Sequence, residues 1–253
     1  MGGLFHHQRH PRRCYVICGI ARSGSNLLSD ALRDTGRAGR PNQFFLSSSI
    51  AQFRAAHGFA AEVSFADYVL GIVKKTATSN EVFGFKLMAW YLEDFLARLR
   101  QTGAFAGPDD SDLVMLERAF PRLQFIEITR REKLLQAISK ARAFQTGVWK
   151  VEPGRMESEQ PRFDRALIAR CLDDAVEEER IWSEFFVRIE REPFRVTYEE
   201  LCQNYSAVIN EVINFLQIKL PRRIRIGPPK TIRQSDAISD EWVRRYRAGE
   251  SVA

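Results

Sequence analysis

The stretch Tyr15–Arg33 restricts the fold of this chain more than any other. Tyr15–Cys18 is a short apolar run with β-branched and aromatic residues, which predicts a buried strand. A small polar turn covers residues 19–26, and from Leu27 onward apolar residues recur with helical spacing, so a helix is expected to begin near Ser25. Such a junction directs backbone N–H groups and the positive end of the helix dipole to one point. The sequence therefore predicts a phosphate-binding turn.

The residues of this turn favour an anion that is bound without a metal ion. The spacing Gly19-x4-Gly24 matches the start of the P-loop pattern, but Ser25-Asn26 replaces the Lys-Ser/Thr that holds phosphate and magnesium in nucleoside triphosphatases. A cation stands earlier in the turn, at Arg22. The alternative is a plain strand–turn–helix junction with a capping serine. We expect the anion-binding loop to consist of Arg22, Ser23, Gly24, Ser25 and Asn26.

A second anion site is predicted in the middle of the chain. Residues 124–129 are typical of a strand that ends in Arg130, and Ser139 lies on the helix expected to follow. Ligands of parallel α/β proteins bind at the carboxyl ends of the strands, where this arginine and serine can converge on a phosphate. Two separated phosphate sites imply a ligand that is phosphorylated at both ends. By the same rule Lys86, at the end of the predicted strand 82–90, faces the ligand crevice; a surface lysine is the alternative.

The remaining patterns predict a single α/β domain over residues 1–253, with residues 1–13 as a flexible lead-in. A fourth strand is expected over 194–198, and the last helix is expected to begin with Ser239 as its N-cap. A long helix is expected over 164–190, and its acidic run Glu177–Glu179 is interpreted as a solvated face. One residue of this run could instead point into a crevice. Further helices are expected over 50–80, 113–120, 131–144 and 207–216.

Charge and cysteine content narrow the function classes. The net charge of +6 favours a polyanionic ligand, but the basic residues are scattered among 32 acidic ones, and the nearest basic segment, Arg222–Lys230, is short. We therefore expect no nucleic-acid partner. The four cysteines form no CxxC pair, and no apolar run reaches membrane-spanning length. These features predict a cytoplasmic protein without a transmembrane segment. Peripheral association with the inner face of the membrane is compatible with them.

Six collinear blocks of the chain resemble the bacterial trehalose 2-sulfotransferase family. The resemblance implies a P-loop-like sulfotransferase fold with a central parallel sheet flanked by helices. It also implies 3′-phosphoadenosine 5′-phosphosulfate (PAPS) as the donor and, as the acceptor, a carbohydrate hydroxyl of trehalose, a glycolipid or a lipopolysaccharide sugar. A homodimer is a further expectation. The blocks are residues 18–33, 36–45, 83–90, 120–149, 196–201 and 232–247.

The resemblance also assigns roles to residues. Arg22–Asn26 would hold the 5′-phosphosulfate, Arg130 and Ser139 would hold the 3′-phosphate, and Arg233 is a further candidate for that phosphate. Arg22 and Lys86 are the candidate catalytic cations.

Gln43 stands where the trehalose enzyme has a glutamate base. Because a glutamine cannot accept a proton at neutral pH, three alternatives follow: His57, Glu93 or Asp94 serves as the base, the acceptor is oriented rather than deprotonated, or activity is low. Arg40 stands where that enzyme has an acidic residue, which favours a more anionic acceptor.

Three functions follow from these observations. The first is a PAPS-dependent carbohydrate sulfotransferase, which agrees with the two anion sites. The second is a non-catalytic protein that binds PAPS or its desulfated product PAP, and it is motivated by Gln43. The third is a metal-dependent nucleotide kinase or hydrolase, against which the missing Lys-Ser/Thr argues.

Overall fold

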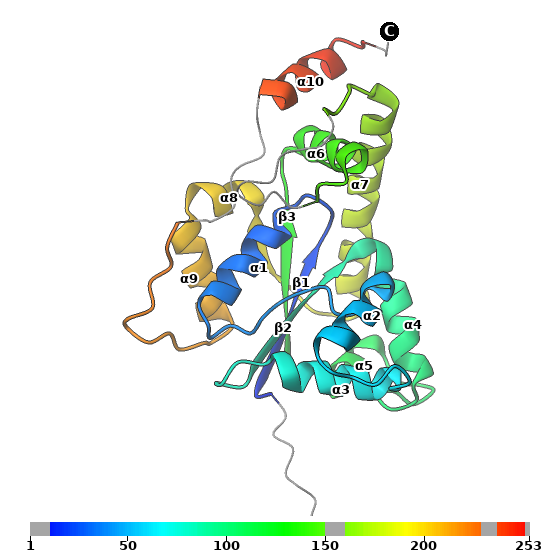
Figure 1. The fold of residues 1–253 in the computed structure, drawn as a ribbon, viewed down its shortest axis with the longest axis vertical. Helices are drawn as coiled ribbons and strands as arrows, with labels where there is room; N and C mark the ends of the chain where they lie inside the picture. Colours follow the sequence, from blue (N-terminus) through cyan, green and yellow to red (C-terminus); the bar gives the residue numbers. More distant parts are fainter. Residues whose placement is uncertain (1–10, 150–159, 229–236, 251–253) are drawn as a thin grey trace, which may run out of the picture.

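A four-stranded parallel sheet forms the centre of the molecule (Figure 1). The computed structural model describes residues 11–149, 160–228 and 237–250. The strand order is β2-β1-β3-β4, and every neighbouring pair is parallel. The predicted α/β fold with a central parallel sheet is confirmed. The strands are β1 (Arg13–Gly19), β2 (Val82–Met88), β3 (Leu123–Thr129) and β4 (Phe194–Thr197).

The central strand β1 is buried on both faces, and its side chains alternate between two hydrophobic cores. Cys14, Val16 and Cys18 belong to one core, whereas Tyr15 and Ile17 belong to the other. Successive side chains of a strand point to opposite faces of the sheet. A strand between two helical layers therefore has no polar face, which explains the continuous apolar run in the sequence.

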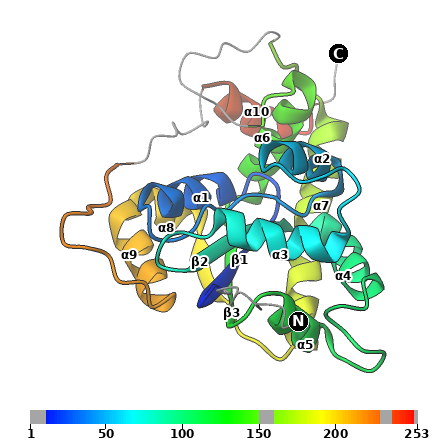
Figure 2. The ribbon, with the colours of Figure 1, turned by 60° about the horizontal axis from the view of Figure 1, so that its bottom comes forward.

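Helices cover both faces of the sheet (Figures 1 and 2). One core contains α1 (Ser25–Asp34), the short α8 (Tyr198–Gln203) and α9 (Tyr205–Phe215). The opposite core is formed by α2 (Ser47–Ala56), α3 (Phe65–Thr76), the 3-10 turn η1 (Ala89–Tyr91), α4 (Leu92–Gln101), α5 (Asp112–Ala119) and part of α7 (Arg165–Arg188). A third, smaller core joins α6 (Lys133–Thr146), the start of α7 and α10 (Ala237–Arg247).

The structure differs from the sequence predictions at several element boundaries. The helix expected over 50–80 is divided into α2 and α3, and the strand expected over 82–90 ends at Met88. β4 ends at Thr197, whose hydroxyl caps α8 by accepting a hydrogen bond from the N–H of Glu200, so Tyr198 begins a helix. Ser239 lies inside α10, and its prediction as an N-cap is wrong. β1 begins at Arg13, so the last residue of the expected lead-in belongs to the sheet. Residues 1–10 of that lead-in lie outside the described residues.

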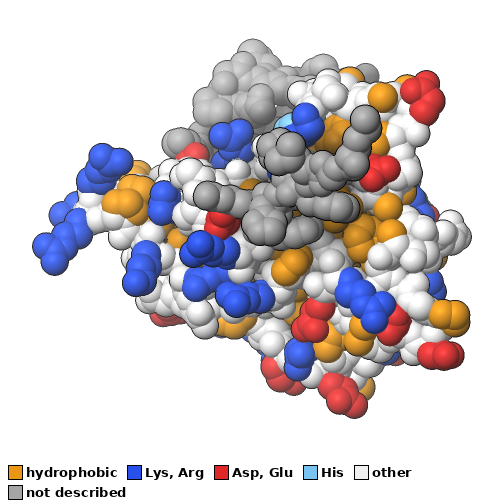
Figure 3. All heavy atoms as spheres, turned by 90° about the horizontal axis from the view of Figure 1, so that it is seen from below, with side chains coloured by type: hydrophobic (Ala, Val, Ile, Leu, Met, Phe, Trp, Pro, Cys, Tyr) orange, Lys and Arg blue, Asp and Glu red, His pale blue; other side chains and the backbone are white. Residues whose placement is uncertain are grey.

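Acidic and basic side chains share the surface seen in Figure 3. Basic side chains gather at its left, where the segment after α9 projects from the body (Figures 1 and 3). That segment carries the exposed residues Arg222, Arg223 and Arg225, while residues 229–230 of the predicted basic segment lie outside the described range. Within the described part of the chain, no helix is both long and apolar enough to cross a membrane.

Candidate active site

A cavity of about 980 Å³ opens at the carboxyl ends of the strands. Its volume lies at the upper end of the range for small-molecule sites. Of the predicted site residues, Ser23 is fully buried and does not line the cavity, and Arg233 lies outside the described residues. The cavity brings together the other predicted site residues, Arg22, Gly24, Ser25, Asn26, Gln43, Lys86, Arg130 and Ser139.

The predicted anion loop has the backbone of an anion cradle. Gly24 is the N-cap of α1, and no side-chain hydrogen bond from the described residues caps this helix. The hydroxyl of Ser23 donates instead to the carbonyl of Ile20, at 2.8 Å. The alternative prediction, in which a serine caps this helix, is therefore wrong. The first N–H groups of α1 remain as donors beside Ser25, which lines the cavity.

Two residues of this loop have left-handed backbone conformations. Gly24 has a φ of 91°, and Arg22 has a φ of 64° although it carries a side chain. A Cβ atom at Gly24 would lie 2.7 Å from Cδ2 of Tyr198, so the position requires glycine for space as well as for its backbone angle. Glu81, Arg122, Glu190 and Gln217 also have a positive φ, so the backbone angle of Arg22 alone does not mark the loop as functional.

The side chain of Arg22 crosses toward the second predicted anion site. Its Nε donates to Oγ of Ser139 at 2.8 Å, and one terminal nitrogen donates to the carbonyl of Trp149 at 2.5 Å. Burial, followed by the positive charge of Arg130, lowers the pKa of Arg22 to about 10. A negative ligand beside Arg22 would oppose both effects, so this corner of the cavity favours an anion.

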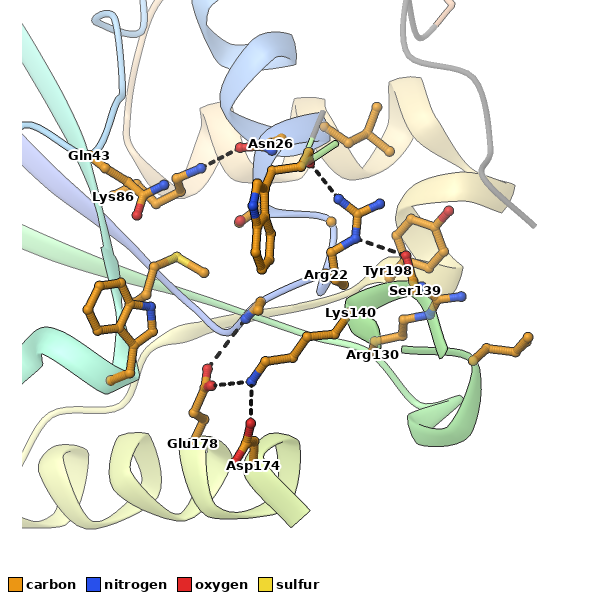
Figure 4. Close-up of a pocket in the computed structure, with 18 of the residues that line it drawn as sticks. Arg22, Asn26, Gln43, Lys86, Arg130, Ser139, Lys140, Asp174, Glu178 and Tyr198 are labelled. Atoms are coloured by element: carbon orange, nitrogen blue, oxygen red, sulfur yellow. Dashed lines mark hydrogen bonds and ion pairs between the residues drawn. The ribbon is translucent and has the colours of Figure 1, made fainter. Parts of the chain in front are cut away.

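Arg130 lies where the sequence predicts it, directly after β3, and it is buried. Its guanidinium group lies 4.6 Å from the centre of the Tyr198 ring, in a cation–π contact. Arg130, Ser139 and Tyr198 thus form one side of the cavity, with Arg22 reaching into it (Figure 4). The two predicted anion sites are neighbours that share a hydrogen bond, closer together than the sequence suggested. Tyr198 was not predicted, although it follows β4 as Arg130 follows β3.

Lys86 and Gln43 lie together on the other side of the loop (Figure 4). Lys86 is buried at 4% exposure, which overturns the surface-lysine alternative. Its Nζ donates to Oδ1 of Asn26 at 2.5 Å. Because this contact occupies the amide oxygen, the amide nitrogen of Asn26 is left as a hydrogen-bond donor. This side of the cavity thus combines the ammonium group of Lys86 with the neutral amides of Asn26 and Gln43.

The third wall of the cavity comes from α7 and is acidic. Asp174, Glu177 and Glu178 line it at the spacing of one helix face. Glu178 and Lys140 are buried together at 3.0 Å, and Asp174 binds the same ammonium group at 3.0 Å (Figure 4). Burial acts to lower the pKa of Lys140, but Glu178 and Asp174 outweigh it and the net shift is upward. Glu178 is the one member of the run 177–179 that is buried, and Lys140 was not predicted.

The alternative bases do not lie in this cavity. His57, Glu93 and Asp94 are absent from its described lining, and so is Arg40, which is exposed. Asp94 instead accepts a hydrogen bond from Ser47, at 2.8 Å. The acidic side chains that line the cavity are those of α7, and the argument that Arg40 favours an anionic acceptor receives no support from the geometry.

Fold and site together define a parallel α/β protein with an arginine-containing anion loop and a large cavity for a small-molecule reaction. The Stf0 sulphotransferase family model matches residues 14–249, and the chain belongs to this family. The predicted family is thereby confirmed.

The chain is also similar to individual sulfotransferases. It is 29% identical to a trehalose 2-sulfotransferase of Mycobacterium tuberculosis (strain ATCC 35801 / TMC 107 / Erdman), a match that covers 93% of this chain and 95% of the relative. It is 29% identical to the trehalose 2-sulfotransferase of Mycolicibacterium smegmatis, over 94% of this chain and 95% of that protein. Among solved structures, the sulfotransferase domain from the Synechococcus PCC 7002 olefin synthase matches with a TM-score of 0.44 and 12% identity, over 98% of both chains. A sulfotransferase acting on a carbohydrate is the activity that the two sequence relatives support.

Proposed function

We propose that this chain transfers a sulfuryl group from PAPS to a hydroxyl of a carbohydrate, without a metal ion. The observation that carries the proposal is the uncapped start of α1, which faces a cavity also lined by Arg22, Arg130 and Ser139. Two anions at adjacent places match a nucleotide with a 3′-phosphate and a 5′-phosphosulfate. Family membership supplies the sulfuryl group as the group that moves.

The residues of the loop have a direct role in this reaction. Transfer forms a bond between the acceptor oxygen and sulfur and breaks the bond between sulfur and the bridging phosphate oxygen. Negative charge then grows on the leaving phosphate, where the N–H groups at the start of α1 and the nearby charge of Arg22 would stabilise it. Two nitrogens of Arg22 donate to Ser139 and to the Trp149 carbonyl, so its guanidinium would contact that phosphate through the remaining terminal nitrogen or after turning from Trp149. The Lys-Ser/Thr of a magnesium-dependent P-loop is not required.

The acceptor hydroxyl must also lose its proton. Gln43 lines the cavity but cannot accept a proton at neutral pH. Among the described residues, the carboxylates on the cavity wall are Asp174, Glu177 and Glu178, and the first two have half-exposed side chains. We assign proton acceptance to this wall of α7, in place of His57, Glu93 or Asp94.

The proposal is tested by transfer of labelled sulfate from PAPS to a panel of saccharides that includes trehalose, in the presence of a chelator. We expect a sulfated product and free PAP in equal amounts. Failure of every acceptor in a protein that binds PAP would favour the non-catalytic alternative. Activity that disappears with the chelator would contradict the metal-free mechanism.

The presence of glutamine at position 43 favours the non-catalytic alternative. The role of this position can be tested by substitution. If a base is missing at this position, Gln43→Glu should raise turnover by ~10²-fold, the lower end of what general-base catalysis contributes. If α7 provides the base, the variant should change turnover by less than about threefold, which is the result we expect. PAP affinity measured by calorimetry serves as the control, since neither account predicts that it changes.

A further inference from the structure

A closed ring of contacts connects the two predicted anion sites through α6 and α7. Arg22 donates to Oγ of Ser139 at 2.8 Å (Figure 4). Lys140, the residue after Ser139 on α6, donates to Oε1 of Glu178 at 3.0 Å. The other oxygen of Glu178, Oε2, accepts from the N–H of Ala21 at 3.4 Å, and Ala21 precedes Arg22 in the chain. The ring therefore starts and ends in the anion loop.

Two more side chains of the same helices hold the backbone of the anion loop. Nε2 of Gln136, on α6, donates to the carbonyl of Ala21 at 2.7 Å, so the N–H and the carbonyl of Ala21 are both bound. Nε1 of Trp182, on α7, donates to the carbonyl of Gly19 at 2.9 Å. Gln136 and Trp182 are 0% and 1% exposed, and both are absent from the described lining of the cavity. They act on the loop, not on a ligand.

Glu178 is suited to this position because a carboxylate has two acceptor oxygens. One oxygen binds an ammonium group on α6 and the other binds a backbone N–H of the loop, so the side chain joins the two elements at a defined distance. Apolar residues often replace a buried ion pair without loss of stability. They cannot accept the hydrogen bond from Ala21, so a carboxylate at this place does more than fill buried space.

We propose that Glu178 and Gln136 are positioning residues that set the spacing between the two anion sites. A nucleotide with one phosphate occupies one of the sites, and its affinity does not depend on this spacing. A nucleotide with phosphates at both ends gains from the second contact only if the loop and α6 are held in the matching arrangement beforehand. This inference rests on the proposed sulfotransferase function, and it adds the residues through which the chain selects a doubly phosphorylated donor.

The experiment compares two nucleotides by calorimetry: PAP, and adenosine 5′-monophosphate (AMP), which lacks the 3′-phosphate. We expect wild type to bind PAP about 30-fold more tightly than AMP, the effect of one further charge-assisted contact. Glu178→Gln should lower this ratio by about tenfold, because a misplaced contact group loses most of its effect. A glutamine has one acceptor oxygen, so its amide nitrogen faces either the N–H of Ala21 or the ammonium group of Lys140.

A second variant, Gln136→Met, tests the spacing without changing any charge. It removes the donor to the Ala21 carbonyl and keeps a buried side chain of similar length. We expect the ratio of the two affinities to fall by about threefold or more, for the same reason as in Glu178→Gln. Partial unfolding lowers the affinity for both nucleotides by one factor, so the ratio reports positioning and not stability. If Glu178→Gln does not fold, Gln136→Met decides alone.

The matched control is Glu184→Gln, the same substitution further along α7. Glu184 forms an ion pair with Arg180, its side chain is 61% exposed, and it is absent from the described lining of the cavity. This variant should keep the wild-type ratio. A wild-type ratio in both positioning variants, or equal losses of affinity for both nucleotides, would overturn the inference. A change in folded Glu178→Gln alone would also overturn it, because the lost charge would then explain the result.

The same titrations separate this inference from the proposed function. If wild type binds neither nucleotide, the proposed function fails. If wild type prefers PAP and the two positioning variants keep that preference, the inference fails and the nucleotide site remains. Equal affinity of wild type for PAP and AMP would also overturn the inference, since the chain would then make no selection for the second phosphate.

Discussion

At the scale of single residues, Arg22 connects the two halves of the nucleotide site. It belongs to the loop before α1 and donates to Ser139 on α6, so one side chain joins two elements that are far apart in the sequence. Burial lowers its pKa, and the positive charge of nearby Arg130 lowers it further because the two cations repel each other. A bound anion relieves this repulsion, which makes Arg22 the residue most sensitive to the donor.

Arg22→Ala should therefore weaken PAP binding and slow transfer by at least ~10²-fold, the effect of removing one preoriented transition-state contact. Arg22→Lys should restore part of the affinity, because it keeps the charge but not the planar geometry. Arg118→Ala is the control, since Arg118 is exposed and pairs with Asp110 on a distant loop. Turnover by Arg22→Ala equal to that of the wild type would show that the donor binds elsewhere.

The sequence predicted the site residues near strand ends and Ser139 on the helix after β3, but it did not identify Lys140 or Tyr198 as site residues. Arg22 and Arg130 follow β1 and β3 directly, and a parallel sheet brings such positions to one edge. Lys140 and Glu178 come from α6 and α7, and each is indistinguishable in sequence from a residue on a solvated helix face. Their burial depends on how the two helices cross, which no local pattern encodes.

At the scale of elements, the pair of α6 and α7 is held by a buried ion pair. Lys140 and Glu178 have side chains that are 8% and 9% exposed, and Asp174 binds the same ammonium group although its side chain is 54% exposed. Removing one partner of a buried pair leaves an uncompensated charge. Removing an exposed partner costs little, because water replaces it.

Glu178→Gln should accordingly lower the free energy of unfolding by about 3 kcal/mol, the lower limit for a broken buried pair. Asp174→Asn, which removes a carboxylate at the same distance from the same lysine, should cost less than about 1 kcal/mol. Urea unfolding of both variants measures the difference. Equal losses would mean that burial does not control this interaction.

A similar comparison is possible between Gly24, in the loop between β1 and α1, and Gly103, which follows α4. Gly24 and Gly103 both have a positive φ, but a Cβ atom meets Tyr198 at Gly24 and nothing within 4 Å at Gly103. Gly103→Ala should cost about 1 kcal/mol, from the left-handed backbone alone. Gly24→Ala should cost more and should weaken PAP binding by ~10-fold or more, because α1 and Tyr198 must move apart.

If calorimetry showed that Gly24→Ala binds PAP as tightly as the wild type does, the N-terminus of α1 would not be in contact with the nucleotide.

The boundary at Tyr198 explains why the sequence prediction missed the helix α8. Residues 194–198 suggest a continuous strand, but the Thr197 hydroxyl caps a helix that starts at Tyr198. A capping side chain competes with strand propensity over a few residues, and the sequence alone does not say which prevails.

At the scale of the whole molecule, the cavity divides into a basic side and an acidic side. On the basic side, Arg22 and Arg130 follow β1 and β3 and Lys86 lies in β2, whereas the acidic side comes from α7. The central parallel sheet was predicted from the resemblance to the family, and the basic side was predicted from residues at strand ends. The acidic wall was not predictable, because it depends on how α7 packs against α6 and against one face of the sheet.

The central claim is that one adenosine bisphosphate occupies the basic side of this cavity, and titration of PAP into the protein by calorimetry tests it most directly. We expect one molecule to bind per chain, with the same affinity in the presence of magnesium or of a chelator, and with at least ~10²-fold weaker binding in Arg22→Ala. Absence of binding heat at several temperatures, or binding that requires magnesium, would contradict the account.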